Sequence, residues 1–333
     1  APDGKMLSVE ALEDGLFRVR LAADGAAASE SLLNRYGMIE GDWKGPAAFR
    51  RSASGFETAE AKVSVADGVA TFRSKVSAAN VTVAPKIVGK GFSVRFSLAD
   101  GERIYGLGDA SRANIMRRPG KYDIWISNNT CNIPIPMTLS SAGWGLLLNC
   151  TWRNAWDVGE SDPGAMVCTA EEGPVDLYLF VGRGYPELLD AYTRLTGRSA
   201  LLPAFGYGLS FVCNQHIDQF NLVNDAMRFR EYDLPCDVLG LEPGWMEKFY
   251  DRSVHKRFDR SKFSFPFWAP TAEFTWPSAL RRIGFKLSLW LCCNYDLTRY
   301  EEQCVKGVPP QTKAQQAADG RKDQAWTDVR ITG

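Results

Sequence analysis

The chain has 333 residues, and its 39 Lys and Arg balance 39 Asp and Glu, so the formal net charge is zero. This balance argues against a nucleic-acid or anionic-membrane partner, since phosphate affinity needs a basic surplus, and no apolar run approaches the ~20 residues of a membrane helix. With 45% hydrophobic and 23% charged residues, the composition is that of a globular protein of one large domain or two ordinary ones.

Period-two alternation in the first part of the chain, up to residue 180, predicts antiparallel strands. The segment 92–98 alternates four apolar with three polar side chains, and 144–150 and 175–180 are further strand candidates. Asp67-Gly68 lies between two short apolar runs and supplies the positive φ angles of a tight hairpin turn. Many short strands with one solvated face predict a β-sandwich.

The pattern changes at residue 185. Apolar residues recur at helical spacing over 185–196, with Pro186 in the first turn and Gly197 just past the end. We place a domain boundary near Arg198, with a β-sandwich domain over 1–198 and a second domain over 199–333.

Strands alternate with helices in this second domain. The predicted strands are 205–212, 236–241 and 286–293, and a short helix covers 277–283. Near-continuous apolar strands separated by helices predict a parallel sheet covered on both faces. For the first helix we expect Asn214 as the N-terminal cap. Its expected buried face consists of Ile217, Phe220, Val223 and Met227.

Parallel β/α units place functional side chains at the carboxyl ends of their strands. Three such ends are predicted here, at 213–215, 242–245 and 294–296. Glu242 stands out because it ends an apolar strand at this edge, although a solvated loop acid or a helix-capping acid would fit the same pattern. Trp290, inside the third strand, fits either a core residue or a platform for a sugar ring.

Cysteine and histidine usage gives no metal or redox motif. There are two histidines, and the eight cysteines contain no C-x-x-C pair, which excludes zinc-ribbon and thioredoxin-like sites. We expect the cysteines to be small buried side chains rather than a disulfide framework, and we expect neither a metal nor a cofactor. The compartment and the oligomeric state stay open.

Three segments in chain order carry a resemblance to a known family. Residues 104–109 (IYGLGD) resemble the YGLGE-type segment of glycoside hydrolase family 31, with Asp in place of Glu. Residues 192–197 (YTRLTG), with Leu202-Pro203, are similar to that family's entry into its barrel. Residues 234–246 (LPCDVLGLEPGWM) are similar to its second barrel strand.

The resemblance implies a galactose-mutarotase-like β-sandwich followed by the first part of a (β/α)8 TIM barrel, truncated after about three β/α units. It also implies hydrolysis of α-glycosidic bonds in an oligosaccharide or glycoside. Family members act on α-glucosides, α-xylosides, α-galactosides or sulfoquinovosides, and some are transglycosylases or lyases. Most work by retention, with two carboxylates about 5 Å apart.

The family's nucleophile ends barrel strand four and its acid/base follows strand six. The 135 residues of 199–333 are too few for a whole barrel of about 250 residues. We therefore expect the catalytic pair downstream of Gly333 and assign no catalytic residue within the chain. A non-catalytic carbohydrate-binding or interaction protein with a degenerate barrel is the alternative.

Substrate-binding residues are also implied by the resemblance. Glu242 takes the place of an Asp that hydrogen-bonds hydroxyls of the non-reducing sugar, and its extra methylene leaves the preferred sugar open. Trp290 and Asn294 are expected near it. In the family, a loop of the N-terminal domain reaches over the barrel mouth to the leaving-group subsite. The matching stretch here is 122–132, including Asn128, although an ordinary surface loop would fit it equally well.

Overall fold

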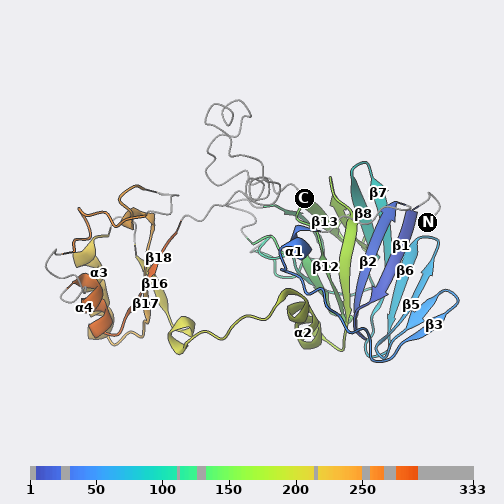
Figure 1. Ribbon diagram of the computed structural model, residues 1–333, viewed down its shortest axis with the longest axis horizontal. Helices are drawn as coiled ribbons and strands as arrows, with labels where there is room; N and C mark the ends of the chain where they lie inside the picture. Colours follow the sequence, from blue (N-terminus) through green and yellow to red (C-terminus); the bar gives the residue numbers. More distant parts are fainter. Residues whose placement is uncertain are drawn as a thin grey trace. The chain divides into compact units, whose positions relative to one another are not determined.

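The computed structural model describes residues 5–23, 31–110, 113–125, 133–213, 217–249, 256–265 and 275–291 (Figure 1). Their contacts divide into two compact units, one ending at Arg198 and the other beginning at Ser199. We call them unit 1 and unit 2 and describe each by itself. None of the helices in the described ranges is long and apolar enough to cross a membrane.

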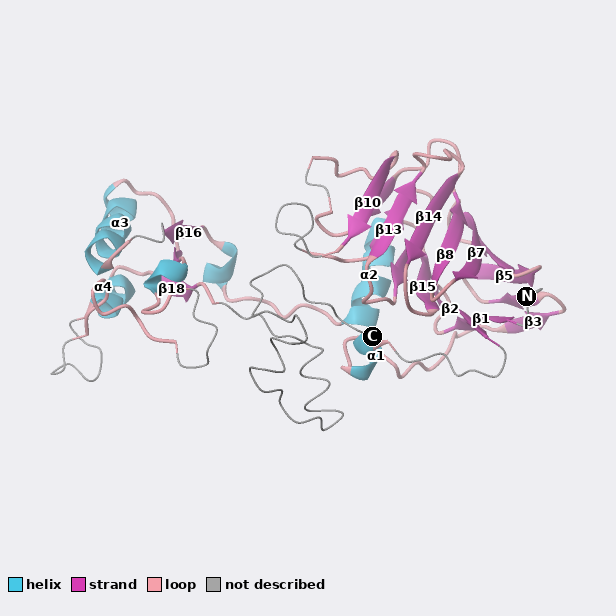
Figure 2. Ribbon diagram, turned by 90° about the horizontal axis from the view of Figure 1, so that it is seen from above, coloured by secondary structure: helices cyan, strands magenta, loops and turns pink. Residues whose placement is uncertain are grey.

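Within the described part of unit 1, the strands form two antiparallel sheets (Figure 2). In spatial order, the six-stranded sheet consists of β1 (Lys5–Ala11), β2 (Leu16–Ala23), β15 (Val175–Val181), β12 (Trp144–Leu148), β11 (Met137–Ser140) and β9 (Ile104–Gly106). The nine-stranded sheet consists of β10 (Gly120–Ile124), β13 (Asn154–Val158), β14 (Ala165–Ala170), β8 (Gly91–Ser97), β7 (Asn80–Val88), β6 (Val69–Ser74), β5 (Ala61–Ala66), β4 (Gly55–Glu57) and β3 (Arg50–Ser52).

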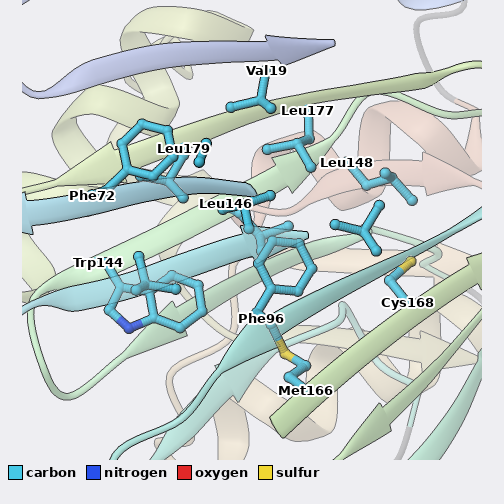
Figure 3. Close-up of a cluster of buried hydrophobic side chains, with 14 of the residues drawn as sticks. Val19, Phe72, Phe96, Trp144, Leu146, Leu148, Met166, Cys168, Leu177 and Leu179 are labelled. Atoms are coloured by element: carbon cyan, nitrogen blue, oxygen red, sulfur yellow. The ribbon is translucent and has the colours of Figure 1, made fainter. Parts of the chain in front are cut away.

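The two sheets pack face to face over one core, as expected of a β-sandwich. Figure 3 shows Val19 and Leu179 of the six-stranded sheet among Phe72 and Phe96 of the nine-stranded sheet. The alternation read over 92–98 is confirmed, because its four apolar side chains are all buried. Burying such side chains supplies about 25 cal/mol for each Å² of apolar surface removed from water.

The outer face of the six-stranded sheet is covered by α2 (Tyr185–Thr196), with the short helix α1 (Leu32–Arg35) nearby. Leu188, Ala191 and Leu195 of α2 pack on Leu147 and Phe180 of the sheet. Strand β15 is therefore buried at every position. The predicted helix over 185–196 is confirmed at both ends.

The described residues of unit 2 form one parallel three-stranded sheet with the strand order β16 (Ser210–Cys213), β17 (Val238–Leu241) and β18 (Lys286–Leu289). Phe211 pairs with Leu239, which pairs with Leu287. The crossover helices are α3 (Gln219–Glu231) and α4 (Trp276–Arg282), and two short turns are η1 (Ala204–Tyr207) and η2 (Pro243–Trp245).

Both helices lie on the same face of this sheet (Figures 1 and 2). Leu222 of α3 and Leu280 of α4 share one buried core with Leu239 and Leu241 of β17. On the other face, the side chain of Val212 is 56% exposed. The expectation of a sheet covered on both faces is therefore not met by the described residues, because an apolar strand sequence does not say on which side its helices cross.

The first predicted strand is shorter than its apolar run. Over 204–207 the chain forms a 3-10 turn, with Gly206 N–H donating to Pro203 O (2.8 Å) and Gly208 N–H donating to Phe205 O (3.3 Å). These local hydrogen bonds take the place of the strand ladder until Ser210.

The start of α3 differs from the prediction, and its buried face differs in part. Its cap is Asp218, whose carboxylate accepts from the N–H groups of Phe220 and Asn221, and not Asn214. Leu222 and Ala226 are buried, whereas Phe220 and Met227 are 75% and 58% exposed. Ile217 and Val223, two of the four expected residues, are partly buried against the same core, so the predicted face is confirmed in part.

Candidate substrate-binding site at the carboxyl ends of the parallel strands

Glu242 directly follows β17 in the middle of the parallel sheet. Leu239 and Leu241 point into the helix-covered core and are 0% and 1% exposed. The backbone at Glu242 is still extended (φ −71°, ψ 169°), so alternation places its side chain on the same face as Gly240. A Cβ built on Gly240 would lie 3.3 Å from Cγ2 of Val212, which identifies this face as the one opposite the helices.

The loop after β17 is tied to the end of β18. Trp290 N–H donates to Leu241 O at 2.9 Å, and Trp245 Nε1–H donates to Trp290 O at 2.8 Å. Lys262 Nζ donates to Gly244 O at 2.9 Å. These bonds fix the backbone on both sides of Glu242, because they span the two neighbouring strand ends.

The loop after β17 packs against a cluster of aromatic rings. Trp245 is 4% exposed, and its ring centroid lies 4.8 Å from that of Phe258. Phe263 and Trp276 are packed at 5.2 Å in the same cluster. These rings form a small core under the loop, so they are not free to stack on a ligand.

The carboxylate of Glu242 is half-buried and makes no hydrogen bond or ion pair with any described residue. The capping alternative is therefore wrong within the described chain: Glu242 is the N-cap residue of η2, but its side chain makes no capping hydrogen bond. By contrast, the nearby Asp259 accepts a hydrogen bond from the Ser261 hydroxyl, which lowers the pKa of that carboxyl. A carboxylate in the position of Glu242 can accept bonds from ligand hydroxyls, at about 1.5–3 kcal/mol for each charge-assisted bond.

Two of the predicted site residues lie at neighbouring strand ends. Glu242 adjoins Trp290 through the Leu241–Trp290 backbone bond, and the half-buried Trp290 packs against the unit 2 core. Asn294 and Asn128 lie outside the described residues. No group of three or more His, Cys, Asp or Glu that could hold a metal ion occurs in the described ranges.

Sequence reasoning placed Trp245 at the predicted strand end 242–245 without a role for it, and it missed Lys262. Pro243-Gly244 signals a turn before Trp245, and this could have marked the indole as a structural ring. Nothing local signals Lys262, because it reaches Gly244 O from 18 residues further along the chain.

Unit 1 has a pocket of its own, distant in sequence from Glu242. It has a volume of about 410 Å³ and is lined by Ala110, Asn114, Pro119, Gly120, Lys121, Tyr122 and Glu160. The ammonium of Lys121 lies 3.4 Å from Asp157, so its charge is already partnered. Neither Glu242 nor Trp290 lines this pocket, whereas Tyr122, at the start of the predicted stretch 122–132, does.

No protein-family model matches the chain. Its sequence relatives include three α-xylosidases. That of Saccharolobus solfataricus is 29% identical over 181 residues (51% of this chain, 24% of that protein), and that of Emericella nidulans is 26% identical over 203 residues (58% and 24%). The α-xylosidase of Lactiplantibacillus pentosus is 25% identical over 209 residues (59% and 26%). The chain thus spans about a quarter of the length of these relatives.

Solved structures agree in fold. A family 31 dextranase of Flavobacterium johnsoniae, complexed with isomaltotriose, matches with a TM-score of 0.72 at 18% identity, over 92% of this chain and 38% of that chain. A family 31 α-xylosidase of Xanthomonas citri matches with a TM-score of 0.67 at 15% identity, over 92% and 50%. In sequence and in fold the chain is therefore a relative of α-xylosidases and other glycoside hydrolase family 31 enzymes, and the resemblance inferred from its motifs is confirmed.

Proposed function

We propose that the protein serves the hydrolysis of α-glycosidic bonds as the N-terminal part of a retaining α-glycosidase of the family 31 type. Residues 1–198 would be the sandwich domain, and 199–333 the first β/α units of the catalytic barrel. The nucleophile and the acid/base would come from later units. The similarity to α-xylosidases over about a quarter of their length supports this assignment.

One observation carries the proposal. Glu242, which has no hydrogen-bond or ion-pair partner among the described residues, follows the middle strand of a parallel sheet whose helices lie on one face. Sequential strand order with both helices on one face is the geometry of consecutive units of a (β/α)8 barrel, whose active site lies at the carboxyl ends of its strands. The structural matches support the barrel assignment, because the 92% that they cover exceeds unit 1 alone.

In this proposal Glu242 accepts hydrogen bonds from hydroxyls of the bound sugar. Trp290 and Asn294 would complete the same subsite, and Asn128 would contact the leaving group. Solved relatives in complex with isomaltotriose, glucose and xylose support a carbohydrate ligand.

The test is Glu242→Gln in the longer protein that contains this chain. We expect kcat/KM on its α-glycoside to fall about tenfold or more with an unchanged melting temperature, because the charge is lost while the shape stays. Glu247→Gln, at an exposed acid of the same loop, is the matched control. If both variants had the same kcat/KM, Glu242 would be an ordinary solvated acid with no role in substrate binding.

The residues that follow Gly333 in the longer protein test the location of the catalytic pair. We expect a fourth strand that ends in an Asp. A stop codon in that place would favour the non-catalytic carbohydrate-binding alternative instead.

A further inference from the structure

We propose that Lys262 is a positioning residue for sugar recognition: its ammonium fixes the peptide group that holds the backbone of Glu242 at the end of β17. This role rests on the proposed function, which assigns Glu242 to hydroxyls of the bound sugar. Every contact that supports it joins described residues of unit 2.

The carboxylate of Glu242 takes its direction from its own backbone. It makes no hydrogen bond or ion pair with any described residue, so no neighbouring side chain holds it in place. Pro243 restricts the preceding residue to the extended region, in which Glu242 lies. How firmly the carboxylate is aimed is therefore decided by the turn that follows, over 243–245.

Lys262 acts on the peptide group between Gly244 and Trp245. Its Nζ donates to Gly244 O at 2.9 Å, and the Trp245 N–H of the same planar peptide group donates to Glu242 O at 3.0 Å. The ammonium and the Glu242 carbonyl are thus the two ends of one chain of hydrogen bonds. A charged donor on the oxygen of a peptide group polarises it and strengthens donation by its N–H.

The position of Lys262 is itself fixed by neighbouring segments. Its N–H donates to Asp259 O at 3.0 Å, and its carbonyl accepts from the N–H of Gln219, the first residue of α3, at 3.1 Å. The side chain of Gln219 also accepts from Ser264 N–H at 2.9 Å. The Nζ of Lys262 lies 3.9 Å from Asp259 Oδ2, so an ion pair orients the ammonium. Lys262 therefore joins the start of α3 to the turn after β17.

Backbone pairing brings this lysine to the turn. Glu247 N–H donates to Arg257 O, and Asp259 N–H donates to Trp245 O, each at 2.9 Å. The two segments run side by side, and the lysine side chain spans from one to the other. It reaches Gly244 O although the two residues are 18 positions apart in the chain.

Arg230 provides a matched control at the opposite end of the same sheet. Its Nε donates to Ile283 O and its Nη2 donates to Cys236 O, each at 2.9 Å. These carbonyls precede β18 and β17, at the amino ends of the strands. Arg230→Met therefore removes a cation from backbone carbonyls of unit 2 and leaves the strand ends beside Glu242 untouched.

The first measurement is hydrogen exchange of the Trp245 amide in this chain, taken as a ratio to the amides of β17 so that a general loss of stability cancels. We expect Lys262→Met to raise this ratio about tenfold or more, and Arg230→Met to leave it within about twofold of the parent. Lys262→Arg should restore it to within about threefold, because a guanidinium also donates to carbonyls.

Equal exchange ratios in Lys262→Met and Arg230→Met would overturn the proposal. If Lys262→Met does not fold, Lys262→Gln takes its place and must give the same ratio, because its shorter, neutral side chain puts no donor at the position of Nζ.

The second measurement is kcat/KM of the longer protein on its α-glycoside, with Lys262→Met introduced into the parent and into Glu242→Ala. We expect a fall of about fivefold in the parent and of less than about twofold in Glu242→Ala, which has no carboxylate left to position. A lysine that only stabilises the fold would lower both backgrounds alike. Arg230→Met should leave kcat/KM of the parent unchanged.

The outcomes separate this role from the proposed function. Faster exchange at Trp245 with equal kinetic effects in both backgrounds would overturn the role in recognition. An active parent whose kcat/KM is unaffected by Glu242→Gln would refute the assignment of Glu242 to the sugar, while the exchange ratio would still decide whether Lys262 fixes the turn.

Discussion

Folding shifts the pKa values of two neighbouring glutamates of unit 1, Glu57 and Glu60, in opposite directions. Hydrogen bonds from Lys75 and then from Arg50 lower the pKa of Glu57 from 4.5 to about 2. Burial raises the pKa of Glu60, and the negative charge of Glu187 adds to the effect. The first carboxyl is therefore stabilised as an anion by folding, and the second is stabilised as a neutral acid.

Glu60→Gln should raise the melting temperature at neutral pH. Folding holds the proton of Glu60 more tightly, so its contribution to stability is complete below the unfolded pKa and is lost as pH rises through the folded pKa. The gain from the substitution should disappear near pH 4. Melting curves over a pH series measure it, and a variant that is less stable than the parent at neutral pH would contradict the assignment.

Glu57→Gln should have the opposite effect on stability to Glu60→Gln. The contribution of Glu57 is present above pH 4.5 and is lost as pH falls towards about 2, so the substitution should lower stability at neutral pH only. Its partners are exposed lysine and arginine side chains, so the loss should shrink as salt is added.

At the scale of single elements, the cap of α3 can be tested directly. Asp218 accepts two backbone hydrogen bonds at 2.9 Å from the first turn of the helix. Asp218→Ala should therefore reduce the free energy of unfolding of unit 2 by about 1 kcal/mol. Asp225→Ala, inside the same helix, removes the same charge without removing a cap and should be close to neutral in a urea titration.

The buried face of α3 gives a second comparison within one element. Leu222 is completely buried between the helix and the sheet, whereas Met227 is 58% exposed. Leu222→Ala should reduce the free energy of unfolding of unit 2 by about 2–5 kcal/mol, because it leaves a cavity in a packed core. Met227→Ala should stay within about 0.5 kcal/mol. A larger loss of unfolding free energy in Met227→Ala than in Leu222→Ala would contradict the packing described here and favour the buried face predicted from the sequence.

At the scale of the whole molecule, the two units have separate cores and should unfold separately. Every residue from Gly197 to Val212 is exposed, so trypsin should cleave after Arg198 and leave a folded unit 1. We expect two thermal transitions, of which only one shifts in Leu222→Ala. A single cooperative transition that moves as a whole in this variant would contradict independent units.

Local signals in the sequence determined those elements that do not depend on distant partners. Helix α2 matches its predicted bounds because Pro186 and Gly197 punctuate an amphipathic repeat. The hairpin between β5 and β6 turns at Asp67 and Gly68 with φ angles of 51° and 75°, as the Asp-Gly pair predicted. Glu242 was also visible from sequence, because an acid that interrupts an apolar strand needs no tertiary information to be noticed.

Only the tertiary structure decided what depends on segments far apart in the chain. Both helices of unit 2 cross on one face, and α3 buries Leu222 rather than Met227 against the sheet. The tie between Trp245 and Trp290 spans 45 residues, and the contact between Asp109 and Ile133 spans 24. Hydrogen bonds of this kind leave no periodic trace, because a carbonyl acceptor belongs to every residue alike. The sequence therefore identified Glu242 at the strand end, and only the folded chain showed that Trp245 and Lys262 fix the backbone around it.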